Sequence, residues 1–160
     1  MKITIYTDGS SQGNPGPGGY GIVMLSSSGH RKEFSAGYRK TTNNRMELLA
    51  VIVALESIKV LNQDVVVYSD SKYVVNAVEK KWVFGWKKSG FKKKKNPDLW
   101  KRFLKVFENH LVSFVWVKGH NNNKENERCD RLAVLAAQQV KNHLIDSWYE
   151  QDQKKDVELF

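Results

Sequence analysis

The sequence predicts one α/β domain whose mixed sheet begins with an antiparallel meander and continues with parallel crossovers. Three observations support this prediction. A chain of 160 residues suits one domain rather than two. An apolar fraction of 41% is enough for an ordinary core. Strand-like and helix-like patterns follow one another in the order β-β-β-α-β-α-α-β-α.

Alternation of apolar and polar side chains predicts the first three strands. Residues 3–6 alternate in this way, as a half-buried strand does. Residues 20–25 and 33–38 predict the second and third strands, and the intervening SSSG, residues 26–29, indicates a hairpin turn. These strands are therefore expected to form the meander.

A helix, a strand and a second helix follow. Residues 46–58 are apolar over most of the girth of a helix, so this helix is expected to pack on two sides. The β-branched run DVVVYSD, residues 64–70, predicts a buried strand. Residues 71–80 predict the next helix.

The last part of the chain predicts a helix, a strand and a final helix. Asn96 suits an N-cap, Pro97 the first helical position and Asp98 the positive end of the helix dipole. Residues 111–117 predict the fifth strand. Asn126 is expected to cap the last helix, whose apolar residues repeat at i+3 and i+4.

The glycines Gly16, Gly18 and Gly21 have the spacing of a dinucleotide-binding turn. Such a turn needs a helix directly after it, because the helix N-terminus holds the pyrophosphate. Here Tyr20 and Ile22 continue in strand-like alternation instead. The glycines therefore indicate a structural turn, which can also touch substrate backbone, rather than a cofactor site.

Charge and cysteine content limit the partners and the compartment. The formal net charge of +9 favours a polyanionic partner such as nucleic acid, and the alternative is a basic surface without a partner. The single cysteine, Cys129, excludes an internal disulfide and fits a reducing cytoplasm. No signal-peptide pattern and no long apolar run is present, so we expect a cytoplasmic protein.

A basic segment runs through the middle of the chain. Residues 80–95 contain eight lysines and no acid, with Trp82, Phe84, Trp86 and Phe91 interleaved. Lysines neutralise phosphates, and aromatic rings pack on sugars or anchor the segment, so this composition favours a nucleic-acid-binding arm. The alternative is a solvated charge run with core aromatics.

Four carboxylates are expected to meet at one edge of the sheet. Asp8 and Asp70 end two strands that are expected to be parallel neighbours, and Glu47 and Asp130 lie in first turns of helices. Each of these carboxylates, taken alone, could instead be explained as a turn former or as a charge at a helix end. Together they would repel one another without a cation, and hard oxygen ligands suit Mg²⁺ or Mn²⁺. Two such ions can hydrolyse a phosphodiester.

Four sequence blocks closely resemble bacterial ribonuclease H of type 1, over about residues 3–137. They are YTDGSSQGNPGPGGYG, TTNNRMEL, SDSKYV and VKGHNNNKENERCDRLA. The resemblance implies the ribonuclease H-like α/β fold, a five-stranded mixed sheet with helices on both faces. It places that domain at residues 1–145, with a basic protrusion at about 80–97 and a polar, flexible tail at 146–160.

The resemblance also implies a Mg²⁺-dependent endonuclease that cuts the RNA strand of RNA/DNA hybrids, leaving 5′-phosphate and 3′-hydroxyl ends. Two Mg²⁺ ions are expected with substrate, and Mn²⁺ can substitute. The implied catalytic residues are Asp8, Glu47, Asp70, His120 and Asp130, of which the four carboxylates hold the metal. His120 assists proton transfer or product release, and Glu127 matches a supporting acid.

Substrate contacts are implied in the same way. Asn14, Asn43 and Asn44 would read the RNA minor groove, although the two adjacent asparagines could also cap a helix. Thr42 and Arg45 resemble a DNA phosphate pocket. The further substrate-binding residues expected are Lys72 and, on the protrusion, Trp82, Trp86, Lys87 and Lys88.

The sequence departs from the family pattern at three places. Ser11 and Lys72 replace a frequent cysteine and glutamine, and the latter change affects base-edge contacts. The run NNN at residues 121–123 replaces a loop with glycine and proline, which leaves the effect of His120 open.

Two other functions and one further partner remain open at this point. The chain could be another metal-dependent nuclease of the same fold, or a non-catalytic hybrid-binding module. We expect a monomer. The ending DVELF, residues 156–160, resembles peptides that dock on the bacterial sliding clamp, and the alternative is a frayed terminus.

Overall fold

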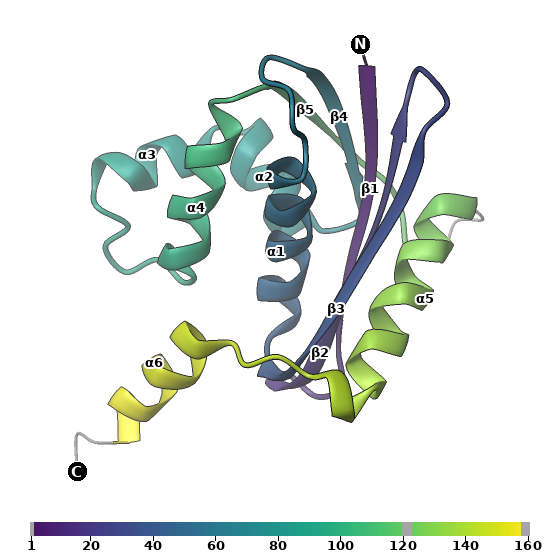
Figure 1. Ribbon diagram of the computed structural model, residues 1–160. Helices are drawn as coiled ribbons and strands as arrows, with labels where there is room; N and C mark the ends of the chain where they lie inside the picture. Colours follow the sequence, from purple (N-terminus) through teal and green to yellow (C-terminus); the bar gives the residue numbers. More distant parts are fainter. Residues whose placement is uncertain (1, 120–122, 158–160) are drawn as a thin grey trace.

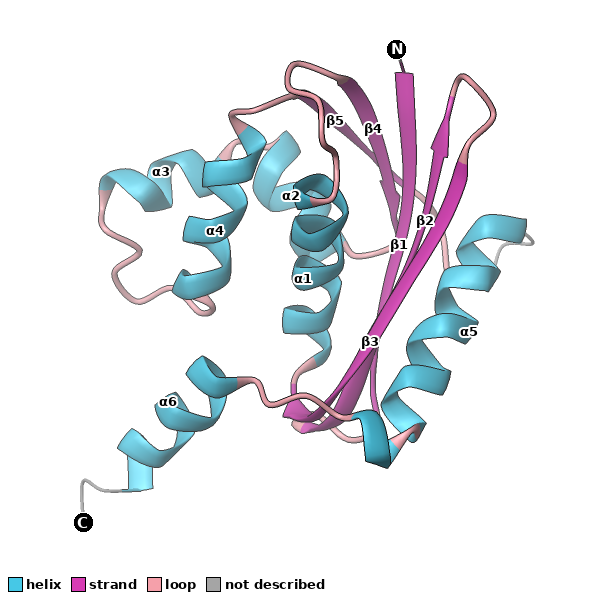
Figure 2. Ribbon diagram, viewed as in Figure 1, coloured by secondary structure: helices cyan, strands magenta, loops and turns pink. Residues whose placement is uncertain are grey.

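The computed structural model describes residues 2–119 and 123–157. Its five strands form one mixed sheet in the order β3-β2-β1-β4-β5 (Figures 1 and 2). Neighbouring strands are antiparallel among β1, β2 and β3 and parallel among β1, β4 and β5. The predicted combination of a meander and parallel crossovers is confirmed.

The elements follow the expected order, with two additional α-helices and a 3₁₀ turn in the described ranges. None of the described helices is both long and apolar enough to cross a bilayer. In chain order the elements are β1 Lys2–Ser11, β2 Gly16–Ser26, β3 Arg31–Thr41, α1 Asn43–Glu56, β4 Asp64–Ser69, α2 Lys72–Glu79, α3 Trp82–Lys88, α4 Pro97–Phe107, β5 Leu111–Trp116, α5 Lys124–Gln138, η1 Val140–Asn142 and α6 Ser147–Val157.

Helices cover both faces of the sheet (Figure 1). α1 packs on β1 and β2, and α5 packs on the opposite face over β1, β2 and β3. α4 lies on the outer side of α1, so α1 is enclosed between the sheet and α4, as its apolar girth predicts. Its fully buried apolar residues are Met46, Leu48, Ala50, Val51, Ile52, Ala54 and Leu55.

The glycine-rich stretch enters a strand and not a helix. Gly16 begins β2, and Tyr20 and Ile22 are buried within it, so the prediction of a structural turn is confirmed. Gly21 lets α5 approach the sheet closely. A Cβ atom at this position would lie 2.8 Å from the Leu132 Cβ and 3.0 Å from the Cys129 carbonyl carbon.

The basic segment projects from the body of the domain (Figure 1). It contains the short helix α3 and the loop that leads to α4, neither of which its composition reveals. Its aromatic residues anchor it. The Trp86 ring packs edge-on against the Trp100 ring, with the centroids 5.7 Å apart, and Trp100 is fully buried. The lysines between these rings remain at the surface.

The C-terminal residues differ from the expected flexible tail. Residues 147–157 form α6, and Asp146 just before it is buried. The reason is tertiary: Asp146 pairs with Arg45, and Arg39 makes two hydrogen bonds to Glu150. These contacts join positions about 100 residues apart, so no local pattern reveals them. The domain boundary at residue 145 stays a prediction.

We expect Gly21→Ala to destabilise the protein, because the added methyl group would push α5 away from β2. The loss should be about 2 kcal/mol or more, which overpacking of a core typically costs. Urea unfolding measures it. Gly85→Ala is the control, since a Cβ there meets nothing within 4 Å and alanine favours the helix. An unchanged midpoint for Gly21→Ala would contradict this account.

Candidate active site

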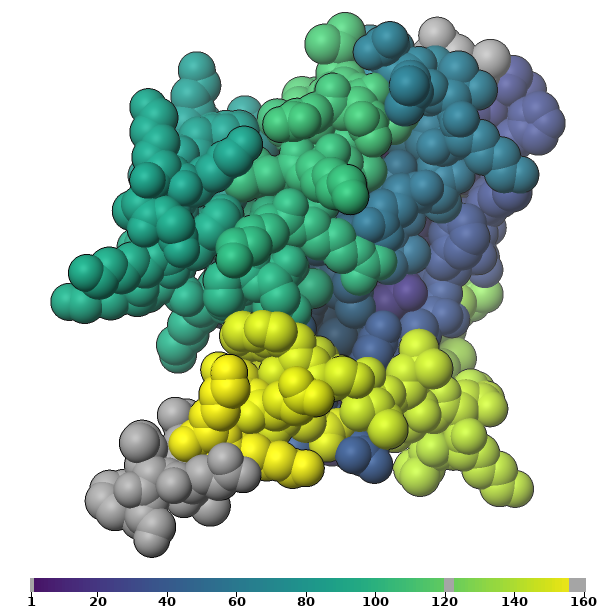
Figure 3. Space-filling view, turned by 60° about the vertical axis from the view of Figure 1, so that its left-hand side comes forward, coloured from purple at the N-terminus to yellow at the C-terminus, as the bar shows by residue number. Residues whose placement is uncertain are grey.

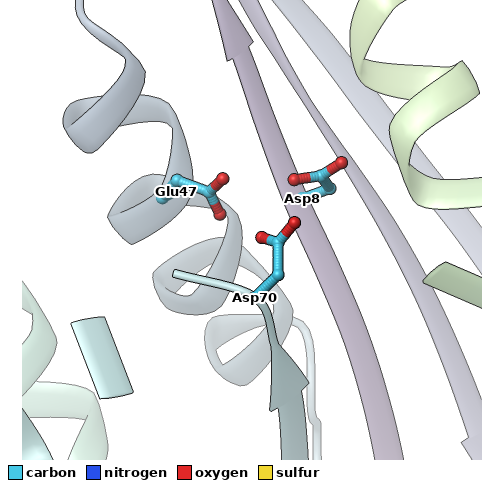
Figure 4. A group of neighbouring side chains, drawn as sticks. All are labelled: Asp8, Glu47 and Asp70. Atoms are coloured by element: carbon cyan, nitrogen blue, oxygen red, sulfur yellow. The ribbon is translucent and has the colours of Figure 1, made fainter. Parts of the chain in front are cut away.

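Three carboxylates meet at one edge of the sheet (Figure 4). Asp8 lies in β1, Glu47 in α1 and Asp70 directly after β4. Each offers one oxygen atom, and these atoms all lie within 4.8 Å of one another. Figure 4 shows the carboxylates of three separate elements facing one another, as the sequence predicts for these residues.

Strand register brings Asp8 and Asp70 together. β1 and β4 are parallel, with Tyr6 opposite Tyr68, so the two aspartates lie two residues further along each strand. The sequence led us to expect that Asp8 ends its strand, but it does not. β1 continues to Ser11 by pairing with β2 alone, while β4 ends before Asp70.

The absence of a side chain at Gly9 brings Glu47 to the same point. A Cβ at Gly9 would lie 2.5 Å from the Glu47 nitrogen and 2.8 Å from the Met46 carbonyl carbon. Only glycine allows α1 to cross β1 at this distance. Glu47 is consequently buried, with 4% of its surface exposed.

Asp130 reaches the site from α5. It lines a small cavity of about 20 Å³ beside the three carboxylates. The lining residues are Thr7, Asp8, Asp70, Gly119, Asn126, Glu127 and Asp130. Asp130 and Glu127 therefore share this cavity with Asp8 and Asp70, whereas Glu47 joins the same two aspartates in the 4.8 Å cluster.

The carboxylates are placed so that they disfavour one another's charge. Burial, and then the negative charge of Asp70, raise the pKa of Asp8 to about 8. Burial and the charge of Asp8 raise the pKa of Glu47 well above its ordinary value. The Glu47 Oε2 atom is buried and has no hydrogen-bond partner among the described residues. The cluster therefore needs a positive charge to ionise fully.

The donor set fits a divalent cation of the magnesium type. All the ligand atoms that these residues offer are carboxylate oxygens, which Mg²⁺ and Mn²⁺ prefer. The unpartnered Glu47 oxygen supplies a position that a cation would satisfy. Asp8, Glu47, Asp70 and Asp130 are the residues that would hold it.

The start of α5 differs from the prediction. Asn123, rather than Asn126, is the N-cap, and its Oδ1 accepts hydrogen bonds from the Glu125 and Asn126 nitrogens, each at 3.1 Å. The prediction of Asn126 was wrong because the helix begins at Lys124, before its apolar repeat starts at Cys129, so the cap lies three residues earlier than predicted. Asn126 instead lines the acidic cavity. His120 lies outside the described residues.

The predicted minor-groove residues lie together at the start of α1. The Asn43 nitrogen donates a hydrogen bond of 3.1 Å to Asn14 Oδ1, which ties the glycine-rich loop to the helix. Thr42 caps α1 by accepting from the Arg45 nitrogen, so the helix cap considered for the adjacent asparagines belongs to Thr42. Asn14, Thr42 and Asn44 line a groove of about 570 Å³.

Arg45 is a buried ion-pairing residue with 2% of its surface exposed. All five of its side-chain N–H donors are used in hydrogen bonds to Asp98, Asp146 and Asn96. The predicted cap Asn96 begins α4 without a side-chain capping bond, because its Oδ1 accepts from Arg45. A phosphate would have to displace one of these partners to contact Arg45.

The remaining predicted substrate residues lie on α2 and the basic segment. Lys72 begins α2, and its Nζ lies 5.0 Å from the ring centroid of Trp116. Trp82 is half exposed, with Lys80 Nζ 5.2 Å from its ring centroid. Trp86 is partly buried beneath Lys94 Nζ. Lys87 and Lys88 are exposed at the end of α3.

Sequence reasoning did not single out Asp146, Trp116 or Trp148. Trp116 donates a hydrogen bond from Nε1 to the backbone oxygen of Asp70 and so lies beside the carboxylates. The Trp148 ring centroid lies 5.0 Å from Arg45 Cζ. The available signal was the position of two tryptophans: Trp116 at the end of a predicted strand and Trp148 at the start of a polar tail, where a large aromatic side chain is unexpected.

Comparison with known proteins gives a consistent result. The family model described as RNase H matches residues 1–138. A ribonuclease H of Desulforamulus reducens is 60% identical, over 86% of this chain and 89% of its own. A ribonuclease HI of Synechocystis is 51% identical, over 92% and 94%.

Solved structures agree. LC9-RNase H1, described as a type 1 RNase H with the type 2 active-site motif, is 34% identical with a TM-score of 0.78, and the match covers 94% of this chain and 79% of that one. LC11-RNase H1 in complex with an RNA/DNA hybrid is 31% identical with a TM-score of 0.66, covering 86% and 98%.

Asp8→Asn should stabilise the metal-free protein at high pH. The Asp8 pKa is about 8 in the folded state and 3.8 in its ordinary state, so the folded state binds more protons between these values. Stability is therefore lost as the pH rises from about 4 to about 8, and asparagine removes this loss. In EDTA at pH 8, we expect Tm to rise by roughly 5 °C.

At pH 4 the gain in Tm should largely disappear. Asp64→Asn, at an exposed position at the start of β4, is the matched control and should change Tm little at either pH. An equal or lower Tm for Asp8→Asn at pH 8 would contradict the electrostatic account of the cluster.

Arg45→Ala should destabilise the protein strongly, because it leaves the buried Asp146 and the partly buried Asp98 without their cation. Loss of one partner from a buried ion pair costs about 3–5 kcal/mol, measurable by urea unfolding. Arg39→Ala breaks the exposed pair with Glu150 and should have little effect. Equal effects of the two substitutions would count against the buried network.

Proposed function

Since the chain belongs to the ribonuclease H family and is a ribonuclease H that acts on RNA/DNA hybrids, we propose that it cuts the RNA strand internally at a two-ion carboxylate site. The observation that carries this proposal is the meeting of Asp8, Glu47 and Asp70 within 4.8 Å, from three separate elements. Asp130 beside them completes the proposed ligand set.

The reaction is hydrolysis of one phosphodiester bond. A water oxygen attacks the phosphorus, the bond from phosphorus to the 3′ oxygen breaks, and the 3′ oxygen takes up a proton. The products are a 5′-phosphate and a 3′-hydroxyl group. Divalent cations bound at the carboxylates supply the charge that activates water and stabilises the leaving oxygen.

The chain's own residues position these groups. Asp8 and Asp70 present oxygens at the open edge of the sheet, and the buried Glu47 adds an oxygen that bulk water does not reach. His120 is the proposed carrier of a proton during hydrolysis or product release, which rests on the family resemblance. Glu127 supports the site from the cavity wall.

Recognition of the hybrid needs one reader for each strand, because ribose carries a 2′-hydroxyl group and deoxyribose does not. Asn14, Asn43 and Asn44 are the proposed readers of the RNA side, and their shared position at the start of α1 supports this. Thr42 is the proposed contact to a DNA phosphate. Arg45 supports that pocket without contacting the phosphate itself, since its donors already bond Asp98 and Asp146.

The basic segment is the proposed grip on the DNA strand. It projects from the domain and presents lysines beside the rings of Trp82 and Trp86. Lys72, Lys87 and Lys88 are exposed and add positive charge for the same strand. Lysine and aromatic side chains together suit a sugar–phosphate strand.

Four further properties are proposed. The ion is Mg²⁺, for which Mn²⁺ can substitute, and the protein is a monomer of the cytoplasm. A contact between residues 156–160 and a sliding clamp stays a prediction without support, and residues 158–160 lie outside the described part of the chain.

One gel tests the proposal. Labelled RNA/DNA, RNA/RNA and DNA/DNA duplexes are incubated with Mg²⁺ and with EDTA. We expect cleavage of RNA in the hybrid alone, with Mg²⁺ alone. Cleavage of the other duplexes would favour another nuclease of this fold, and binding without cleavage would favour a non-catalytic module.

Asp70→Asn should abolish cleavage while binding of the hybrid survives, because it removes a cation ligand and leaves the nucleic-acid surface intact. Product gels and fluorescence anisotropy measure the two effects, with Asp64→Asn as the control. Cleavage at the normal rate by Asp70→Asn would contradict the assignment of the metal site.

A further inference from the structure

The groove at the start of α1 has a wall that the family-matched region does not include. It has a volume of about 570 Å³. Its lining residues come from the glycine-rich loop, the start of α1, the end of the basic segment and α6. The match to the family model ends at residue 138, before α6 begins.

Figure 3 shows how the walls are arranged. The C-terminal segment, in yellow, borders the teal and green basic segment and α4, and blue atoms of the N-terminal part are recessed between them. The groove is therefore bounded by the proposed substrate-reading residues on one side and by α6 on the other.

α6 is held firmly against this groove. Tyr149 is buried, with 7% of its surface exposed, and its ring centroid lies 5.8 Å from Arg45 Cζ. Asp146 accepts hydrogen bonds from Arg45 and Thr41, and Arg39 binds Glu150 with two hydrogen bonds. The side chains that α6 presents to the groove are consequently pre-positioned rather than recruited by a ligand.

The chemistry of the walls divides the groove in two. Lys94 and Lys95 provide positive charge on the side of the basic segment, whereas Asp152 on α6 would repel a phosphate. Trp148 adds an aromatic ring with 36% of its surface exposed, and Gln153 adds an amide. A strand would thus place its phosphates against the lysines and its sugars or bases against α6.

We propose that α6 is a substrate-binding wall, in which Trp148 and Gln153 contact the sugars or bases of the DNA strand. This rests on the proposed function, because the RNA strand has to lie over the carboxylates. Thr42 and Asn44 precede Glu47 by about one turn of α1, so the groove is displaced from the cut site. Asn14 and Asn44 line the same groove as the proposed readers of the RNA strand, so we assign to the DNA strand only the side of the groove that α6 forms.

The test measures binding of an RNA/DNA hybrid by anisotropy in EDTA, together with kcat and KM in Mg²⁺. Trp148→Ala should weaken binding and raise KM by about fivefold to tenfold, as expected for a lost stacking contact, with kcat within about twofold. Trp148→Phe keeps a ring and should recover most of the affinity. Circular dichroism melting shows whether each variant is folded.

Two glutamines of α6 provide a matched pair. Gln153 lines the groove, whereas Gln151 is exposed elsewhere on the same helix. We expect Gln153→Ala to weaken binding about twofold to threefold and Gln151→Ala to leave it unchanged. If Trp148→Ala and Gln153→Ala bind the hybrid as the unaltered protein does, the proposal is overturned.

The occupant is tested by placing single methylphosphonates along each strand, which removes one phosphate charge at a time. If a methylphosphonate in the DNA strand weakens hybrid binding by the unaltered protein more than it weakens binding by Lys94→Ala, then Lys94 contacts that DNA phosphate and the groove holds the DNA strand. The same result on the RNA strand only, or on neither strand, would overturn the assignment. Failure of the unaltered protein to cut hybrids would instead reject the proposed function.

Discussion

Repulsion among clustered carboxylates, two of them buried, is the constraint on which the rest of this structure depends. Asp8, Glu47 and Asp70 are drawn from β1, α1 and the end of β4 to within 4.8 Å of one another. The sheet register and the bare backbone at Gly9 enforce this approach, although burial opposes the charge of Asp8 and Glu47. Such an arrangement is unfavourable by itself and becomes favourable with a divalent cation. The carboxylate cluster at the sheet edge therefore favours the binding of a cation.

The buried charge of Arg45, in contrast, is fully paired within the protein. Arg45 lies two residues before Glu47 in α1, and Asp98, Asp146 and Asn96 together accept hydrogen bonds from all five of its side-chain donors. The two ion pairs of Arg45 join the start of α1 to α4, through Asp98, and to the segment before α6, through Asp146. Residues that we propose to contact substrate thus share one rigid support, which holds them in a fixed relation to the carboxylates. Binding and hydrolysis depend on the same few helix ends.

The sequence was sufficient for the sheet and for the carboxylates, because both are carried by local patterns. Alternation in β2 and the β-branched run of β4 indicated strands, and the position of Asp70 after such a run indicated the sheet edge. It was insufficient where one long-range contact decides the structure. Asp146 looks like any acid in a polar tail until Arg45 is placed beside it. The cap of α5 was misassigned because Asn123 and Asn126 offer the same chemistry, and only backbone geometry distinguishes them.

Anomalous diffraction from a crystal grown with Mn²⁺ and a non-hydrolysable hybrid tests the central claim most directly. The account predicts anomalous density between the oxygens of Asp8, Glu47, Asp70 and Asp130, beside the phosphate to be cut. Absence of density at this position, with the hybrid seated over the sheet edge, would contradict it. The gathered carboxylates would then have no role in holding the catalytic cation.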